Sequence, residues 1–287
     1  MRFAPQHRQE GGLSIHIHAQ DTADAAIADA FVLARQRGAS LPDFPGRIPA
    51  DLAAAYAVQD LAIAQWPDTV VGWKVGYIAA ERRDVSGDER LLGPIFAKQV
   101  QTAADVIQYP VFVGGFGAIE AEFVLQLGAD APIDKLHWSA AEAAQLPAKL
   151  FIGVEIASSP LATINALGPR VVVSDFGNNN GLVLGPEIVG WTSIPQQQLH
   201  AETWIDDDCV GQGGATQLPG GLLAAYAFAL SRSAQRGRPL TAGTLIATGN
   251  ATGIHDILPG QLGRVRFGEY GQISGLAVVA NTQGAQP

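Results

Sequence analysis

The feature that most constrains the fold is the texture of the chain after residue 69. From there on, short apolar runs alternate with Gly and Pro, a pattern typical of β-strands separated by tight turns. Helical segments interrupt these runs too irregularly for a doubly wound sheet, so we predict an α+β fold with a mixed or mostly antiparallel, curved sheet. The predicted strands are VVGWKVGYI, GPIFAKQV, GAIEAEFVLQL, LFIGVEIA, RVVVSDF, NGLVLG, GTLIATG, GRVRFGEYG and ISGLAVV.

Two helices are predicted before the first strand. From Thr22 to Arg37 apolar residues recur at helical spacing, and Gly38 follows at the position of a C-terminal cap. Residues 49–66 are rich in Ala, and Pro49 would lie in the first helical turn. Such an Ala-rich face would pack closely on a flat surface such as a sheet.

Two further helices are predicted among the strands. Ser139 and Glu142 have the spacing of a capping box, which predicts a short helix. Residues 220–237 form an amphipathic segment that ends at Gly237.

The bulk composition limits the classes of partner. The chain has 287 residues, 47% of them hydrophobic, and a formal net charge of −9. An acidic protein lacks the broad basic face that nucleic-acid binding needs, and no apolar run is long enough for a membrane span. The single cysteine, Cys209, excludes an intramolecular disulfide. We therefore expect a cytoplasmic protein in which an anionic substrate would need a local positive centre.

Lone glutamates in apolar strands are the strongest chemical signal. Glu120 and Glu122 are two residues apart in GAIEAEFVLQL, so strand geometry places them on one face. Glu155 is likewise the only charged residue in FIGVEIA. A solvated acidic face would explain the first pair alone, but three such carboxylates favour a site for Mg²⁺ or Mn²⁺, which prefer oxygen ligands.

Lys74 is a single charge in the run GWKVG. Its flanking glycines allow close approach of a ligand or of a neighbouring chain segment. Taken alone, a surface lysine is the favoured interpretation. The functional alternative is a lysine aimed into a pocket, either as a cation for a carboxylate or as a general acid or base.

Two polar segments at strand ends have both an ordinary and a functional interpretation. The three asparagines from Asn178 predict a loop, which could also supply amide donors to a carboxylate. The small residues of ATGNATG, starting at Ala247, predict a tight turn, which could equally form a cradle for a carboxylate.

The order and spacing of these motifs resemble the fumarylacetoacetate hydrolase superfamily, in its hydratase and decarboxylase branch, which includes 2-keto-4-pentenoate hydratases. The resemblance runs from about Ala50 to Val279. It rests on the segments AYAVQ, GWKVG, GPIF, EAE, VEIA, NGLVLG, LTAGTLIATG and RVRFGEYGQIS.

This resemblance implies a twisted β-roll with helices packed around it, in a homo-oligomer. It implies a divalent metal, Mg²⁺ or Mn²⁺, on Glu120, Glu122 and Glu155, and an active-site lysine at Lys74. Substrate contacts are expected from two segments and one residue of the glutamate strand, namely Asp175 and Asn178, Thr248, Gly249 and Asn250, and Phe123. The composition of the N-terminus and the order of the predicted elements divide the chain into a flexible tail (1–20), an N-terminal helical part (21–68) and a β-roll catalytic domain (69–287).

Two departures bear on the reaction. The segment from Ala79 to Leu92 has no His, which disfavours the hydrolytic C–C cleavage of the superfamily's hydrolases. Hydratases usually carry an acidic residue just before the position of Gly93, where this chain has Leu91 and Leu92. Asp88 or Glu89 could replace it if the loop shifts.

The resemblance favours a lyase that adds water to a 2-hydroxy-2,4-dienoate and gives a 4-hydroxy-2-oxo acid, in the catabolism of aromatic meta-cleavage products. The first alternative is decarboxylation of a 2-oxo-3-enedioate of the 4-oxalocrotonate type. That substrate would want an extra cation, for which Arg82, Arg83 and Arg90 are candidates. The alternative of another class is a non-catalytic binding protein on the same fold.

Overall fold

The computed structural model describes residues 11–102 and 107–280. Its helices are α1 (Gly11–Arg37), α2 (Leu52–Gln65), α3 (Ala140–Ala143), α4 (Ile164–Leu167), α5 (Pro169–Ser174) and α6 (Gly221–Gln235). Its strands are β1 (Val70–Tyr77), β2 (Arg90–Phe96), β3 (Val100–Thr102), β4 (Ile107–Val111), β5 (Phe116–Leu127), β6 (Ala148–Ser159), β7 (Asn179–Glu187), β8 (His200–Ile205), β9 (Asp208–Gly214), β10 (Leu245–Asp256), β11 (Leu262–Arg266) and β12 (Gln272–Val279). Among these residues no helix is long and apolar enough to cross a membrane.

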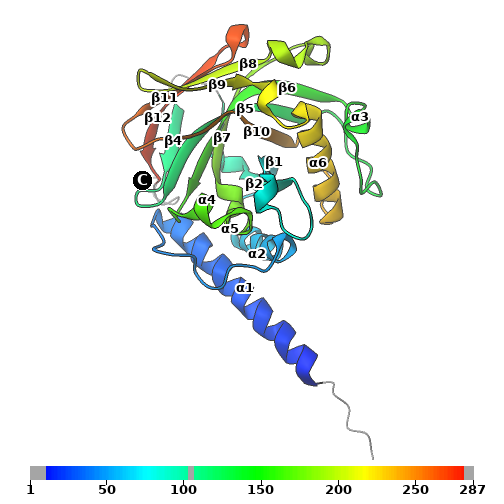
Figure 1. Cartoon of the computed structure of the whole chain (residues 1–287), viewed down its shortest axis with the longest axis vertical. Helices are drawn as coiled ribbons and strands as arrows, with labels where there is room; N and C mark the ends of the chain where they lie inside the picture. Colours follow the sequence, from blue (N-terminus) through cyan, green and yellow to red (C-terminus); the bar gives the residue numbers. More distant parts are fainter. Residues whose placement is uncertain (1–10, 103–106, 281–287) are drawn as a thin grey trace, which may run out of the picture.

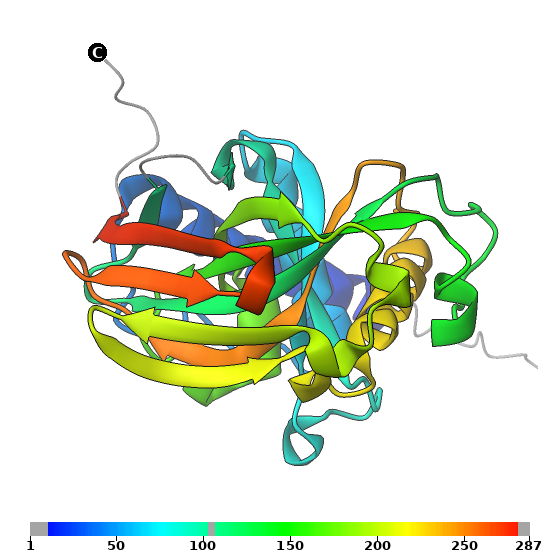
Figure 2. The same ribbon diagram turned by 90° about the horizontal axis from the view of Figure 1, so that it is seen from above.

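Two sheets form the body of the molecule. One has seven strands in the order β2-β1-β10-β5-β6-β7-β3, and the other has five in the order β4-β12-β11-β8-β9. Neighbours are antiparallel except β1 with β10, β3 with β7 and β12 with β4. Figure 2 shows strands β8, β9, β11 and β12 of the five-stranded sheet (yellow to red) on the near side and helices α1 and α2 (blue) behind. The predicted α+β fold with a mixed, curved sheet is confirmed.

The main core lies between the two sheets. Alternate residues of β5, among them Ile119 and Phe123, are fully buried on the face toward the five-stranded sheet. The Phe123 ring meets Phe267, after β11, edge to face at 5.3 Å between centroids. The intervening residues Glu120, Glu122 and Val124 therefore face the other way, into the curl of the seven-stranded sheet.

Helices α2, α4 and α5 lie below the sheets in Figure 1, and α3 and α6 lie at their side. Helix α2 begins later than predicted, because Asp51 and not Pro49 lies at its start: the Asp51 side chain accepts from the Ala54 N–H as an N-cap. Its buried face contacts a strand and a helix at once. Gln59 donates to the carbonyl oxygens of Leu92 in β2 and Val173 in α5.

Helix α1 extends away from the body in Figure 1. It begins at Gly11, eleven residues before the predicted start, and residues 1–10 of the predicted tail lie outside the described residues. It ends as predicted, with Gly38 at φ 60°. The division of the chain at residue 68 stays a prediction.

One predicted strand is wrong. The run RVVVSDF forms helix α5, with Pro169 in its first turn, and continues into a short 3-10 helix from Phe176 to Asn178. A short buried helix and a short buried strand both read as an apolar run, so the sequence pattern does not separate them. The predicted capping box is confirmed, because Ser139 and Glu142 each accept from the other's backbone N–H.

Candidate metal centre and cleft

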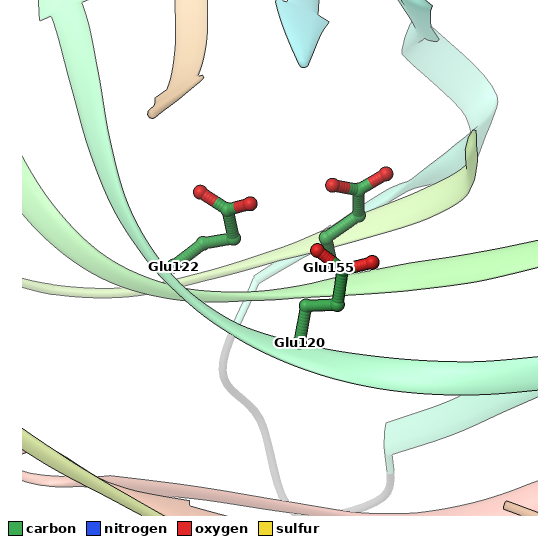
Figure 3. A group of neighbouring side chains, drawn as sticks. All are labelled: Glu120, Glu122 and Glu155. Atoms are coloured by element: carbon green, nitrogen blue, oxygen red, sulfur yellow. The ribbon is translucent and has the colours of Figure 1, made fainter. Parts of the chain in front are cut away.

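Three glutamate side chains converge in the middle of the seven-stranded sheet (Figure 3). Glu120 and Glu122 come from β5, and Glu155 comes from β6, directly opposite Glu120 in the pairing register. The exposed fraction of each is at most 2%. Each offers a carboxylate oxygen, and these three atoms lie within 4.8 Å of one another. The predicted triad is therefore one compact, buried cluster.

One oxygen on each glutamate has no hydrogen-bond partner among the described residues: Oε1 of Glu120, Oε1 of Glu122 and Oε2 of Glu155. A buried carboxylate oxygen without a partner is strongly unfavourable. Three neighbouring glutamates, each with such an oxygen, provide the all-oxygen donor set that Mg²⁺ and Mn²⁺ prefer. The residues present therefore fit a hard divalent cation.

The pKa values of the glutamates reflect the same crowding. Burial, and then the negative charge of Glu155, raise the pKa of Glu120 to about 7 against the effect of Lys74. Burial and the charges of Glu155 and Glu120 raise the pKa of Glu122 well above its usual range. Protein groups alone do not compensate these carboxylates, whereas a divalent cation would.

Lys74 is buried beside the triad, with an exposed fraction of 5%. Its Nζ lies 3.2 Å from Oε1 of Glu155 and donates to Oδ1 of Asn178 at 3.0 Å. Burial lowers the pKa of Lys74, but the three carboxylates outweigh burial and raise it above its ordinary value. The surface interpretation of this lysine is wrong, because its strand runs beside β10 in the sheet interior.

The TGN segment of β10 supports the glutamates. The Gly249 N–H donates to Oε2 of Glu122 at 2.6 Å, and Asn250 forms a side-chain hydrogen bond with Glu120. The Thr248 hydroxyl donates to the carbonyl oxygen of Phe123. Thr248 and Gly249 thus hold the strand and the carboxylate, while Asn250 also lines a cleft beside the triad.

That cleft has a volume of about 220 Å³. Its polar lining includes Lys74, Glu120, Asn165, Asn178, Asn250 and Arg82. Its apolar lining includes Ile78, Leu91, Val172 and Ile254. The charges and amides therefore open onto a space for a small molecule with an apolar wall.

No carboxylate of Asp88 or Glu89 joins that wall in the described part of the chain. Asp88 pairs with Arg232, and Glu89 lies near Arg83 and Arg90. Leu91 lines the cleft instead, and the exposed fraction of its side chain is 4%.

Two predicted substrate contacts are placed elsewhere. Phe123 is fully buried in the core on the opposite face of β5, which corrects its expected place in the cleft: strand alternation separates it from its glutamate neighbours. Asp175 is buried against Arg35 and Ser159.

Sequence reasoning also missed two residues. Asn179 donates to Oε1 of Glu155 at 3.0 Å, and Asn165 accepts from Asn178. The run of three asparagines was a signal for the first. Nothing in the sequence around Asn165 marks it.

No protein-family model and no curated protein matches this sequence. Solved structures do match. Two structures of 4-oxalocrotonate decarboxylase from Pseudomonas putida G7, one with calcium and acetate and one with magnesium and adipate, give TM-scores of 0.73 and 0.74 at 21% identity. The matches cover 90% and 89% of this chain and 98% and 97% of those chains.

A fumarylpyruvate hydrolase from Pseudomonas aeruginosa, solved with Mn²⁺ and pyruvate, is more distant. Its TM-score is 0.53 at 16% identity, over 72% of this chain and 88% of that chain. At these identities the matches show a shared fold, which extends over about nine-tenths of this chain for the two decarboxylase structures. The chain therefore has the fold of the fumarylacetoacetate hydrolase superfamily, as its sequence motifs predicted.

Proposed function

We propose that the protein is a metal-dependent lyase that removes CO₂ from a 2-oxo-3-enedioate and releases a 2-hydroxy-2,4-dienoate. The observation that carries this proposal is the composition of the cleft: it is lined by Lys74 and by Glu120 of the carboxylate triad at one side, and by an apolar wall where hydration would need a proton acceptor. Each glutamate of the triad has an oxygen without a partner among the described residues. The sequence motifs favoured hydration, but the geometry favours decarboxylation.

Glu120, Glu122 and Glu155 are the residues that would hold Mg²⁺ or Mn²⁺. When bound, the ion supplies Lewis acidity toward the C1 carboxylate and C2 oxygen of a 2-oxo acid. Lys74 presents its ammonium group at the same place, held by Glu155 and Asn178. It stabilises negative charge that develops on the C2 oxygen.

The bond changes balance with one proton. The electrons of the bond to the distal carboxylate carbon move through the conjugated system to the C2 oxygen, and CO₂ leaves. The ammonium of Lys74 protonates that oxygen, and solvent returns the proton to the lysine. The reaction needs no oxidant and no added water.

The apolar wall favours this outcome. Ile78, Leu91, Val172 and Ile254 line the cleft that contains Lys74. A carboxylate loses its hydration against such a surface, whereas neutral CO₂ does not need hydration. Hydration would instead require a group that accepts a proton from water, and this chain has Leu91 and Leu92 where the superfamily's hydratases usually carry an acidic residue.

Arg82 attracts the substrate to the cleft and takes no part in bond cleavage. It is exposed, lines the cleft, and also lines an outer groove in which Arg83 and Arg170 outnumber the one acidic residue, Asp84. On an acidic protein, this basic mouth attracts a dianionic substrate. The neighbouring Pseudomonas putida decarboxylase was solved with adipate, itself a dicarboxylate, which supports this assignment.

The test uses Mn²⁺-loaded protein and freshly generated 2-oxohex-3-enedioate, with CO₂ release and ultraviolet absorbance followed together. We expect metal-dependent CO₂ release. Arg82→Gln should raise KM about tenfold with kcat nearly unchanged, because it removes binding that is equal in ground and transition states. Arg83→Gln, at the next position, is the matched control and should change KM less.

Hydration of 2-hydroxypenta-2,4-dienoate is the second candidate. The side-chain amides of Asn165, Asn178 and Asn250 line the cleft and could hold a water molecule there. Hydration would be favoured if the protein consumed 2-hydroxypenta-2,4-dienoate, measured as loss of its ultraviolet absorbance, and released no CO₂ from the enedioate. A purified protein that binds neither Mg²⁺ nor Mn²⁺ would instead favour a non-catalytic binding role.

A further inference from the structure

A second buried cluster of charge lies beside the metal centre, where helix α1 ends. We name it the Arg35 cluster, and it consists of Arg35, Asp175, Ser158, Ser159, Asn179 and Asn180. Arg35 has an exposed fraction of 5%. Its Nε and Nη2 donate to the two carboxylate oxygens of Asp175 at 2.5 and 3.0 Å. This is the bidentate arrangement that a guanidinium makes and an ammonium cannot.

The remaining Arg35 donors hold backbone around Asp175. Nη1 donates to the carbonyl oxygen of Asn179 and to Oδ1 of Asn180, at 3.0 and 3.2 Å. Nη2 donates to the carbonyl oxygens of Ser158 and Asp175, at 3.1 and 3.2 Å. One side chain from α1 therefore clamps both ends of the segment from Asp175 to Asn179.

The clamped segment has an unfavourable backbone. Phe176, Gly177 and Asn178 have φ angles of 53°, 65° and 56°, three left-handed residues in succession. A residue as bulky as Phe rarely adopts this conformation, so its surroundings must impose it. The segment also rests against β2, since a Cβ on Gly93 would lie 2.3 Å from the Phe176 carbonyl oxygen.

Two side chains of this segment contact residues of the metal centre. Asn178 accepts from Nζ of Lys74 at 3.0 Å. Asn179 donates to Oε1 of Glu155 at 3.0 Å, the same oxygen that Lys74 approaches. The orientation of a metal-site glutamate and of the active-site lysine thus depends on the strained segment.

We propose that Arg35 is a positioning residue: through the 175–179 segment it orients Lys74 and Glu155, which makes helix α1 a working part of the metal site. Asp175 is the anchor for Arg35 and does not contact substrate. The inference rests on the proposed metal site, but it holds whichever reaction occurs there.

The test compares Arg35→Lys with Arg37→Lys, an exposed arginine in the same last turn of α1. Mn²⁺ affinity is measured by calorimetry, folding by circular dichroism and thermal unfolding, and kcat and KM by the assay above. We expect Arg35→Lys to fold, to bind Mn²⁺ about 10- to 100-fold more weakly, and to lose kcat more than KM. Arg37→Lys should match wild type.

Asn179→Ala keeps the inference testable if Arg35→Lys folds poorly, because this variant alone should weaken Mn²⁺ binding. Where both variants fold, a double-mutant cycle tests their coupling. Asn179→Ala removes the donor to Glu155 and leaves the clamp in place. If Arg35 acts through this segment, then the losses of Mn²⁺ affinity in the two single variants will not add in the double variant.

Three outcomes would overturn the inference. In the first, Arg35→Lys lowers thermal stability but leaves Mn²⁺ affinity and kcat unchanged. In the second, the losses in the double-mutant cycle are additive. In both, wild-type protein still binds Mn²⁺, so the proposed metal site survives. In the third, wild-type protein binds no Mn²⁺, and the proposed function falls together with the inference.

Discussion

Two neighbouring clusters of buried charge differ in whether the protein itself balances the charge. The metal centre sets three carboxylates against one ammonium, and an oxygen of each glutamate has no partner among the described residues. The Arg35 cluster sets one guanidinium against the carboxylate of Asp175, whose two oxygens both accept from Arg35, while Ser159 adds a donor to one of them. Both places are almost completely shielded from solvent.

The difference shows how to separate a binding site from a structural ion pair. A buried pair whose donors and acceptors match is complete within the protein, and removal of one partner leaves an uncompensated charge. A buried cluster with excess charge and free oxygens is complete only with a ligand. Burial alone does not distinguish the two, whereas the count of unused hydrogen-bonding atoms does.

The first prediction, a complete loss of metal binding, sharpens this contrast at the metal centre. Glu155→Gln should abolish stabilisation by Mn²⁺, which for wild type reaches about 2.7 kcal/mol when the ion is at about 100 times its Kd. The same variant should unfold at an equal or higher temperature than wild type in the presence of a chelator, because it removes one of three repelling carboxylates. Thermal unfolding with and without Mn²⁺ measures both effects.

Glu269→Gln, which removes an exposed carboxylate, is the matched control and should retain stabilisation by Mn²⁺. Full stabilisation of Glu155→Gln by Mn²⁺ would contradict the assignment of this residue as a ligand.

The second prediction also removes a charged side chain, this time from the Arg35 cluster, where we expect a loss of stability. Arg35→Met removes one partner of a buried pair and should lower the free energy of unfolding by about 3–5 kcal/mol, with or without metal. Urea unfolding in the presence of a chelator measures it. A loss below about 1 kcal/mol would show that the pair contributes as little as an exposed one.

The third prediction concerns pH. Burial first, and then the charge of Glu155, raise the pKa of Glu120 to about 7, above its value of 4.5 in the unfolded chain. The neutral form therefore stabilises the fold at low pH, and this contribution is lost as pH rises from about 5 through about 7. We expect the chelator-treated protein to lose on the order of 2 kcal/mol over that range relative to Glu120→Gln.

Saturating Mn²⁺ should reverse this trend, because the ion binds only the ionised carboxylates. Urea unfolding across the same pH range, with chelator or with Mn²⁺, separates the two cases. A metal-free protein that gains stability with rising pH, as much as Glu120→Gln does, would contradict the raised pKa.

The smallest expected effect concerns a residue that forms a hydrogen bond with a proposed metal ligand and is not itself a ligand. Asn250 forms a hydrogen bond with Glu120 and lowers its pKa. Asn250→Ala should therefore weaken Mn²⁺ binding about tenfold, at the lower end of the range for groups that hold metal ligands. Calorimetric titration checks this value. A loss as large as that of Glu155→Gln would instead make Asn250 a direct ligand.

The errors made from the sequence have a common physical origin. The β-branched run before Asp175 was predicted as a strand, yet Pro169 starts a helix there. Phe123 was expected at the substrate because of the resemblance, although strand alternation places it in the core. Taken alone, the segment of Lys74 favoured a surface residue, because nothing in it shows that β10 and β2 lie on both sides; only the resemblance placed this lysine in the active site.

The sequence by itself determined the fold class, the strand that carries Glu120 and Glu122 on one face, and the metal-binding chemistry of three lone glutamates. These follow from local periodicity and from the cost of carboxylates in apolar strands, which any short window of the chain reveals. Only the tertiary structure decided that Glu155 lies opposite Glu120, that Leu91 lines the cleft, and that Arg35 clamps a segment 140 residues away. Such contacts depend on strand order and helix docking, which bring together residues whose own neighbours in the chain carry no sign of the partner.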